Sequence, residues 1–192
     1  MNVYDFDNTV YDGESFIQFF LYFLKLDKSL LKYAPEILVA VIKYKRGALS
    51  IEQALSQYGG QFTEYFAKTI SGGLDLDWHL EHFWDMYANR IKPFYAEVQR
   101  DDDLVISCSP EFSLKVICRR LGIKHYIGTV VDEKTGVIER MCFRENKVKA
   151  FKELYPGCEI DALYTDSVND SPLMEISREV YLVKGNKITK IK

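Results

Sequence analysis

The stretch NVYDFDNT, residues 2–9, carries two aspartates, Asp5 and Asp7, at the end of the first apolar run of the chain. Asn2 to Phe6 predicts a short strand, because a few apolar residues closed off by polar ones are typical of a strand inside a sheet. A tight turn would explain one aspartate. Two aspartates spaced two apart put both carboxylates on the same side of an extended chain, and that pattern indicates a site.

The chain from residue 93 onward alternates short apolar runs with segments of helical character. Ser109, Pro110 and Glu111 predict a helix start, as a capping residue, a proline in the first turn and an acid. Strands are expected at 104–106, 126–131, 137–143, 160–165 and 180–183, and helices at 111–121, 146–155 and 171–177. This order predicts an α/β fold with a doubly wound, mostly parallel, Rossmann-like sheet.

Residues 14–92 differ in character, because nearly all of them favour helix. Glycines and charged residues separate five expected helices, at 15–26, 29–45, 50–58, 61–70 and 77–91. This block lies between the first strand and the alternating pattern, so we expect it to be an insertion. The predicted organisation is an α/β core domain of residues 1–13 and 93–192 with an all-helical cap domain of residues 14–92.

Length and composition limit the classes of function. A chain of 192 residues fits one domain, or one domain carrying an insertion. The net charge of −3 gives no reason to expect a nucleic-acid partner. The four cysteines form no CxxC pair, and no basic-then-apolar leader is visible at the N-terminus. We therefore expect reduced thiols in a cytoplasmic protein that is a monomer or a homodimer.

The most apolar stretches, residues 16–26 and 37–42, are separated by charged residues and a proline. Neither reaches the roughly 18 nearly uncharged residues that a membrane span needs. A membrane partner is therefore not expected, and buried helices are the favoured interpretation. A lipid-facing surface is the alternative.

Polar residues follow several of the expected strands. In open α/β sheets, ligands gather beyond the carboxyl ends of the strands. The candidates there are Asp5, Asp7, Thr9, Ser107, Asp166, Ser167, Asn169 and Asp170, with Lys147 at the start of a helix. Carboxylates brought together repel one another. An oxygen-only ligand set without paired histidine or cysteine points to Mg²⁺ as the cofactor that removes this repulsion.

Such a cluster suits phosphoryl transfer. One aspartate can attack phosphorus and form an aspartyl-phosphate, while Mg²⁺, a lysine and a serine hydroxyl neutralise the charge of the phosphoryl group. A second acid has to protonate the leaving alcohol and then deprotonate the hydrolytic water. Asp7 can serve if its surroundings favour the protonated form, because an ordinary aspartate with a pKa of about 3.9 is a poor acid at neutral pH.

Four motifs, DFDNT, VISCS, the lysine in ENKVKAF and TDSVND, resemble in order those of the haloacid dehalogenase-like (HAD) phosphohydrolases. The insertion resembles the helical cap of the phosphoserine-phosphatase-like branch. The resemblance implies a Mg²⁺-dependent phosphatase that hydrolyses a small phosphomonoester through an aspartyl-phosphate. The implied roles are Asp5 as nucleophile and metal ligand, Asp7 as acid/base with its backbone carbonyl on the metal, Ser107, Lys147, Asn8 and Thr9 as phosphate-binding residues, Asp166 as metal ligand, and Asp170 as support of the metal site or of the lysine.

The chain departs from the family pattern at three positions. Thr165 stands where many members have glycine before the aspartate of the fourth motif, and Asn8 replaces another frequent glycine. The glycine that often precedes the lysine by a few residues is missing, which leaves Lys149 as an alternative to Lys147.

The substrate is less well defined. By the same resemblance, Glu14 matches the acid that recognises the substrate amine in phosphoserine phosphatases, although it also suits a helix start. The cap arginine that those enzymes use for the substrate carboxylate is absent. The aromatic residues 16, 19, 20 and 23 predict helix core, or a box for a choline-like headgroup or a lipid phosphate. Phosphoserine, phosphocholine-like esters and lipid phosphates stay open beside another small phosphorylated metabolite.

Two other classes of function use a similar set of residues. A phosphotransferase would pass the phosphoryl group to an alcohol instead of water. A phospho-accepting regulatory domain also combines aspartate, serine or threonine and lysine around Mg²⁺. Such domains lack a partner acid two residues after the nucleophile, so Asp7 is the residue that separates the enzyme from the regulatory domain.

Overall fold

The computed structural model describes residues 1–33, 35, 38–39, 42–43, 46, 48, 53 and 67–192. Contacts between residues divide the chain into two compact units. Unit 1 consists of Met1–Phe16, His79–Val131 and Ile138–Lys192, and unit 2 consists of Ile17–Trp78 and Asp132–Val137. Unit 1 contains the β-sheet, and unit 2 contains most of the expected helical insertion.

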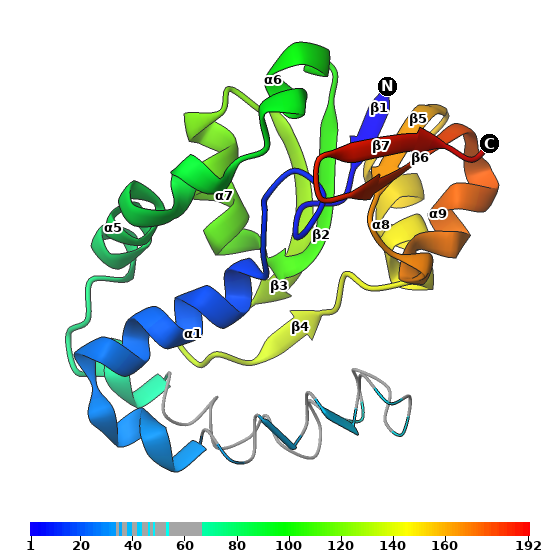
Figure 1. Ribbon diagram of the computed structural model, residues 1–192. Helices are drawn as coiled ribbons and strands as arrows, with labels where there is room; N and C mark the ends of the chain where they lie inside the picture. Colours follow the sequence, from blue (N-terminus) through cyan, green and yellow to red (C-terminus); the bar gives the residue numbers. More distant parts are fainter. Residues whose placement is uncertain are drawn as a thin grey trace. The chain divides into compact units, whose positions relative to one another are not determined.

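The sheet of unit 1 has seven strands in the order β4-β3-β2-β1-β5-β6-β7 (Figure 1). Its strands are β1 (Asn2–Tyr4), β2 (Leu104–Pro110), β3 (His125–Val131), β4 (Ile138–Arg140), β5 (Ile160–Thr165), β6 (Ser177–Lys184) and β7 (Lys187–Lys190). Strands β3, β2, β1, β5 and β6 run parallel, whereas β4 and β7 pair antiparallel at the two edges. The mostly parallel α/β fold expected from the sequence is confirmed.

Helices cover both faces of this sheet. They are α5 (Leu76–Tyr87), α6 (Pro93–Val98), α7 (Glu111–Arg120), α8 (Glu145–Leu154) and α9 (Ser171–Ile176), with 3₁₀ turns η2 (Ala88–Arg90) and η3 (Val168–Asp170). Helices α6 and α7 lie on one side of the sheet, and α8 and α9 lie on the other (Figure 1). The chain winds from β1 to β2 and β3 and then returns past β1 to β5 and β6, so the winding direction reverses beside β1. That reversal is where open α/β sheets bind their ligands.

The register of β1 decides which side chains face which helices. Tyr4 is paired with Tyr164 of β5, which is paired with Tyr181 of β6, and each pair of rings stacks with centroids 4.7 Å apart. On this face Tyr4 also meets Tyr95 of α6, edge to face, at 5.0 Å. Val3 faces the opposite way, into the core cluster that includes residues of α8 and α9. Because side chains alternate along a strand, the residue two after Val3 points toward the α8 side as well.

The segment that follows the helical insertion packs with the sheet. Trp84 of α5 is fully buried and meets Phe6 and Tyr11 edge to face, with ring centroids 5.9 and 5.6 Å apart. Its indole N–H donates to the carbonyl oxygen of Ser113 at 3.1 Å. We expected the insertion to extend to residue 92. Contacts between residues group His79 and the residues after it with unit 1, and the expected domain boundary at residue 92 stays a prediction.

Helix α1 (Ser15–Leu26) has the expected range, and its first two residues belong to unit 1 and the rest to unit 2. The 3₁₀ helix η1 (Lys28–Tyr33) follows it in unit 2. Phe20, Leu30 and Tyr33 form a small buried cluster. Phe20 is one of the four aromatic residues at helical spacing in α1, and its burial agrees with a core role. The expected helices at 29–45, 50–58 and 61–70 lie largely outside the described residues. Within the described residues, no helix has both the length and the apolar character needed to cross a membrane.

Candidate active site

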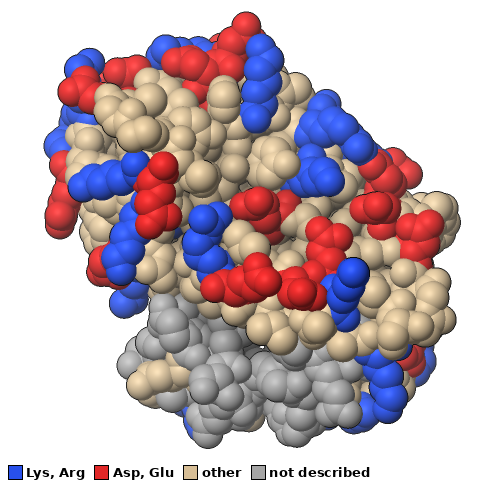
Figure 2. All heavy atoms as spheres, turned by 180° about the vertical axis from the view of Figure 1, so that it is seen from behind, with Lys and Arg blue, Asp and Glu red and all other residues tan. Residues whose placement is uncertain are grey.

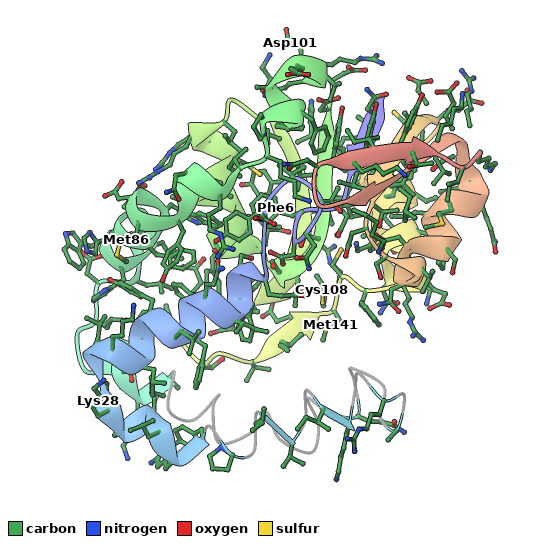
Figure 3. The ribbon with its side chains drawn as sticks, in the orientation of Figure 1. Phe6, Lys28, Met86, Asp101, Cys108 and Met141 are labelled. Atoms are coloured by element: carbon green, nitrogen blue, oxygen red, sulfur yellow. The ribbon has the colours of Figure 1, made fainter. Side chains whose placement is uncertain are left out.

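A loop reverses the chain directly after β1 and its two aspartates. The carbonyl oxygen of Phe6, which lies between Asp5 and Asp7, accepts three hydrogen bonds at 3.2, 2.9 and 2.9 Å, from the backbone N–H groups of Thr9, Val10 and Tyr11. Asn8 adopts a positive φ of 59°, a conformation that asparagine tolerates better than most residues. The turn places both aspartates at the carboxyl edge of the sheet, where Figure 3 labels Phe6 and, at the end of β2, Cys108.

Lys147 lies between two carboxylates. Its ammonium group is 2.8 Å from Asp5 Oδ1 and 2.8 Å from Asp170 Oδ1. All three side chains are buried. Lys147 comes from the first turn of α8, Asp5 directly follows β1, and Asp170 ends η3, so three segments far apart in the sequence converge here. Lys149 is exposed, and Lys147 is therefore the lysine of this site.

Burial and charge act in opposite directions on these groups. Burial raises the pKa of Asp5, and the adjacent Lys147 ammonium opposes that shift. For Lys147, burial alone would lower the pKa, but the carboxylates of Asp170 and Asp5 outweigh it and raise the pKa above its ordinary value. Lys147 therefore remains a cation at neutral pH, the form that binds an anionic oxygen most strongly.

Asp7 is held by two hydrogen-bond donors. Its Oδ1 accepts from the backbone N–H of Ser15 at 2.8 Å, and its Oδ2 accepts from the hydroxyl of Ser109 at 2.5 Å. The two serine hydroxyls are themselves 3.0 Å apart. Burial raises the pKa of Asp7 to about 6, although the hydrogen bonds from Ser109 and Ser15 oppose the shift. A carboxyl group with that pKa can both give and take a proton near neutral pH.

Ser107 and Ser109 belong to β2, which is longer than expected and whose register against β3 is irregular between Ile106 and Pro110. The strand runs from Leu104 to Pro110, and α7 begins at Glu111. The prediction that Ser109 caps this helix is wrong, because Pro110 occupies the cap position and no side chain caps the helix there. The buried hydroxyl oxygen of Ser107 accepts from the backbone N–H of Ser109 at 3.1 Å. Accepting that bond leaves the Ser107 hydroxyl proton for an acceptor in the site.

Thr165, in place of the frequent glycine, fixes the position of Asp170. Its hydroxyl group donates to Asp170 Oδ2 at 2.7 Å and accepts from the backbone N–H of Ser167 at 3.1 Å. Asp170 Oδ1 contacts Lys147, so both carboxylate oxygens of Asp170 have partners in the protein. Of the two roles implied for Asp170, this geometry favours support of the lysine over direct binding of a metal.

Asp166 and Glu14 lie on the acidic side of the site. Burial raises the pKa of Asp166; the Lys184 ammonium opposes the shift, and the charges of Asp170 and Glu14 add to it. Glu14 Oε1 accepts from the side-chain amide of Asn8 at 2.9 Å. The Asn8 side chain is therefore directed at Glu14, and a phosphate-binding role for Asn8 stays a prediction.

Lys92 is a buried residue beside the site that the sequence patterns did not single out. Its ammonium group donates to the carbonyl oxygen of Asn8, and its backbone N–H donates to the carbonyl oxygen of Val10 at 2.8 Å. Burial lowers the pKa of Lys92, and the charges of Asp12 and Asp166 oppose that shift. Lys92 therefore fastens the loop after β1 at two points.

The model of the family "haloacid dehalogenase-like hydrolase" matches residues 3–175. The chain belongs to this family. None of the curated proteins matches its sequence. The match covers all four motifs, and the described geometry joins residues of the first, third and fourth motifs through Lys147 and those of the first and second through Ser109.

Several solved structures share this HAD fold. A protein of unknown function from Bordetella pertussis Tohama I has a TM-score of 0.71 and 22% identity, over 91% of this chain and 85% of that one. A phosphoserine phosphohydrolase-like protein from Francisella tularensis subsp. tularensis SCHU S4 has a TM-score of 0.60 and 16% identity, over 94% and 86%. A phospho-aspartyl intermediate analogue of phosphoserine phosphatase has a TM-score of 0.50 and 16% identity, over 93% and 83%. At these identities the likeness shows the fold alone.

The HAD site offers oxygen ligands of mixed kind for a metal ion. Within the described residues, no three His, Cys, Asp or Glu side chains converge closely enough to hold a metal on their own. Two carboxylates have at least one oxygen that no ion pair among the described residues uses. Asp5 uses only Oδ1 for Lys147, and Asp166 contacts Lys184 only through its backbone carbonyl oxygen. Mg²⁺ is usually bound by one or two carboxylates with water and substrate phosphate, so Asp5, Asp166 and the carbonyl oxygen of Asp7 form a set that fits it.

The remaining predicted residue is less directly involved. Thr9 is fully buried, and its hydroxyl has no hydrogen-bond partner among the described residues. Its predicted role in phosphate binding has no contact to support it. Ser15, Ser109, Thr165 and Lys92 contact the predicted residues but were not predicted as site residues themselves. Ser109 alone carried a usable signal, because it stands two residues after Ser107, the spacing that puts side chains on one face of a strand.

Proposed function

We propose that this HAD-family hydrolase is a Mg²⁺-dependent phosphatase that cleaves a small phosphomonoester through an aspartyl-phosphate on Asp5. The observation that carries the proposal is the contact of the Lys147 ammonium with both Asp5 and Asp170 at 2.8 Å, beside the carboxyl group of Asp7. It supports the proposal because it joins three motifs of the family in one buried site. Membership of a family of hydrolases supports the same reaction class.

Asp5 is the nucleophile of the proposed reaction. A carboxylate oxygen of Asp5 attacks phosphorus, the phosphorus–oxygen bond to the leaving alcohol breaks, and an acyl-phosphate forms. Lys147 keeps the Asp5 carboxylate in place through Oδ1 and lends positive charge to the transferring group. The Ser107 hydroxyl donates to a phosphoryl oxygen, because its own oxygen already accepts from Ser109.

Asp7 is the proton donor and acceptor. In the first half of the reaction its carboxyl group protonates the leaving alcohol. In the second half its carboxylate takes a proton from the water that attacks phosphorus, which releases phosphate and restores Asp5. The bonds from Ser15 and Ser109 keep the carboxyl group in one orientation, and its pKa of about 6 suits both halves.

Asp5, Asp166 and the carbonyl oxygen of Asp7 would hold the Mg²⁺ ion. The bound ion supplies positive charge to the phosphoryl oxygens. The Asp7 carboxylate oxygens are both occupied by hydrogen bonds, so Asp7 offers the metal its backbone and keeps its side chain for proton transfer.

The substrate we propose is a small phosphorylated metabolite that carries a cationic group. Glu14 supports this choice. Burial raises the pKa values of Asp7 and Asp166, and the negative charge of Glu14 raises both pKa values further, so Glu14 lies near enough to act on the site. The exposed carboxylate of Glu14 would attract a positively charged amine on the substrate. The face drawn in Figure 2 mixes acidic and basic side chains, which agrees with a small-molecule substrate better than with a nucleic acid.

A panel of phosphate esters tests this function. Purified full-length chain with Mg²⁺ is incubated with phosphoserine, phosphocholine, a sugar phosphate, a short-chain lipid phosphate and p-nitrophenyl phosphate, and released phosphate is measured. We expect release from at least one ester, its loss in Asp5→Asn, and no change in Asp101→Asn, which alters a carboxylate that is 98% exposed. Absence of phosphate release from every ester would refute the proposal. Phosphoryl transfer to an added alcohol, without release to water, would identify a phosphotransferase instead.

A further inference from the structure

Arg144 adopts a backbone conformation that arginine rarely takes. It precedes α8 with φ 47° and ψ −121°. Positive φ of this kind is comfortable for glycine and strained for a residue with a Cβ atom. Strained backbone conformations of this kind cluster at functional sites, so the Arg144 side chain is a candidate for a functional role.

Helix capping does not account for the Arg144 side chain. Although Arg144 occupies the cap position of α8, its side chain makes no capping hydrogen bond. The backbone carbonyl oxygen of Arg144 accepts from the N–H of Lys147 at 3.0 Å, and glycine would provide that oxygen equally well. The structural contribution of residue 144 is thus made by its backbone.

The guanidinium group extends toward the fourth motif. Its Nε and Nη2 donate to Asn169 Oδ1 at 3.3 and 3.1 Å, and it stacks over the ring of Phe143 at 5.2 Å from the centroid. Arg144 is exposed, and no carboxylate of the described residues forms an ion pair with it. Its remaining N–H groups, including those of Nη1, are therefore available to a ligand.

The position of this group relates it to the candidate active site. Asn169 is adjacent in sequence to Asp170, whose carboxylate contacts Lys147, and Arg144 occupies the cap position of α8, three residues before Lys147. The backbone of Arg144 and its side chain thus each contact a segment that supplies the Lys147–Asp170 pair. A charged fork with free donors, held beside a phosphoryl-transfer site, is suited to an anionic oxygen group.

We propose that Arg144 is a specificity residue that binds a second anionic group of the substrate, a carboxylate or a second phosphate, while the ester phosphate lies at Asp5. This inference rests on the proposed phosphatase function and narrows its substrate class to esters with a further negative group. Asn169 orients the guanidinium and leaves its outer donors for the ligand. Arg144 supplies this cation from the α/β core, directly before α8.

Competitive inhibition provides a test that does not depend on which ester is the natural substrate. Hydrolysis of p-nitrophenyl phosphate by the full-length chain with excess Mg²⁺ is inhibited with phosphoglycolate, with ethylene glycol bisphosphate and with 2-hydroxyethyl phosphate, whose second group is an uncharged hydroxyl. The variants are Arg144→Gly, which suits the backbone, and Arg178→Ala, which removes an exposed arginine at the amino end of β6. Thermal unfolding of Arg144→Gly should occur at or above the wild-type temperature.

We expect at least one of the two esters that carry a second anionic group to bind about tenfold or more tightly than 2-hydroxyethyl phosphate, which corresponds to about 1.4 kcal/mol. Whichever of these two esters binds more tightly shows whether the second anionic group that Arg144 binds is a carboxylate or a phosphate. The preference should disappear in Arg144→Gly, whereas Arg178→Ala should keep both the preference and a turnover of p-nitrophenyl phosphate within about twofold of wild type. Equal inhibition by all three esters in the wild type, or an unchanged preference in Arg144→Gly, would overturn the role of Arg144. Absence of p-nitrophenyl phosphate hydrolysis in the wild type would instead refute the phosphatase function itself.

Discussion

Replacing Thr165 by valine removes a hydroxyl group at almost constant shape. The Thr165 side chain is fully buried. Its hydroxyl group donates to Asp170 Oδ2 at 2.7 Å and accepts from the N–H of Ser167 at 3.1 Å, and valine can make neither bond. A hydrogen bond to a charged group is worth about 1.5–3 kcal/mol and a neutral one about 0.5–1.5 kcal/mol. We therefore expect Thr165→Val to lower the free energy of unfolding by about 2–4 kcal/mol.

The matched control is Thr165→Ser, which keeps the hydroxyl and loses one methyl group, a change worth about 1 kcal/mol. Unfolding in urea is followed by the fluorescence of Trp84, buried in unit 1, in a Trp78→Phe background that removes the other tryptophan. Midpoints and slopes give the free energies. The hydroxyl group is the decisive feature if valine is at least about 1 kcal/mol worse than serine. Equal stability of the two variants would show that the bonds to Asp170 and Ser167 contribute nothing.

Two further predictions follow from other buried charges. Lys147→Met leaves Asp5 and Asp170 buried without their cation, so the free energy of unfolding should fall by about 3–5 kcal/mol. Adding Asp5→Asn should recover part of this loss. A Lys147→Met variant as stable as the wild type would contradict the ion-pair geometry. Burial raises the pKa of Asp103 to about 6 from an ordinary 3.8, so its contribution to stability is present below about pH 4 and lost as the pH rises through about 6. Urea unfolding at pH 4.5 and 7.5 should show a pH dependence about 2 kcal/mol smaller in Asp103→Asn, and identical dependence in both proteins would refute the shift.

The sequence predicted the parts of the site that lie directly after parallel strands. Asp5, Asp7, Ser107 and Asp166 could be placed at one edge because parallel strands end together. The sequence could not choose between Lys147 and Lys149 from spacing alone. The choice depends on which face of α8 turns toward the sheet, and only the packing of that helix decides it.

Other features were missed because a local pattern competed with the fold. Ser109-Pro110-Glu111 is a good helix start, yet pairing with β3 extends β2 through Pro110 and turns Ser109 toward Asp7. Strand β7 (Lys187–Lys190) was not predicted, since its two lysines leave a short polar pattern that becomes a strand only by pairing with β6. The positive φ of Arg144 has no signature in the sequence.

The acyl-phosphate on Asp5 is the central claim, and the variant Asp7→Asn offers the most direct view of it. p-Nitrophenolate leaves without a proton, so this variant with Mg²⁺ should release one p-nitrophenolate per chain and then stall, because position 7 can no longer activate water. Borohydride reduces an acyl-phosphate to an alcohol, which would turn Asp5 into homoserine, detectable by peptide mass spectrometry. We expect homoserine at position 5 only when substrate and Mg²⁺ are present. Continued turnover by Asp7→Asn, or an unmodified Asp5 after the burst, would contradict the mechanism.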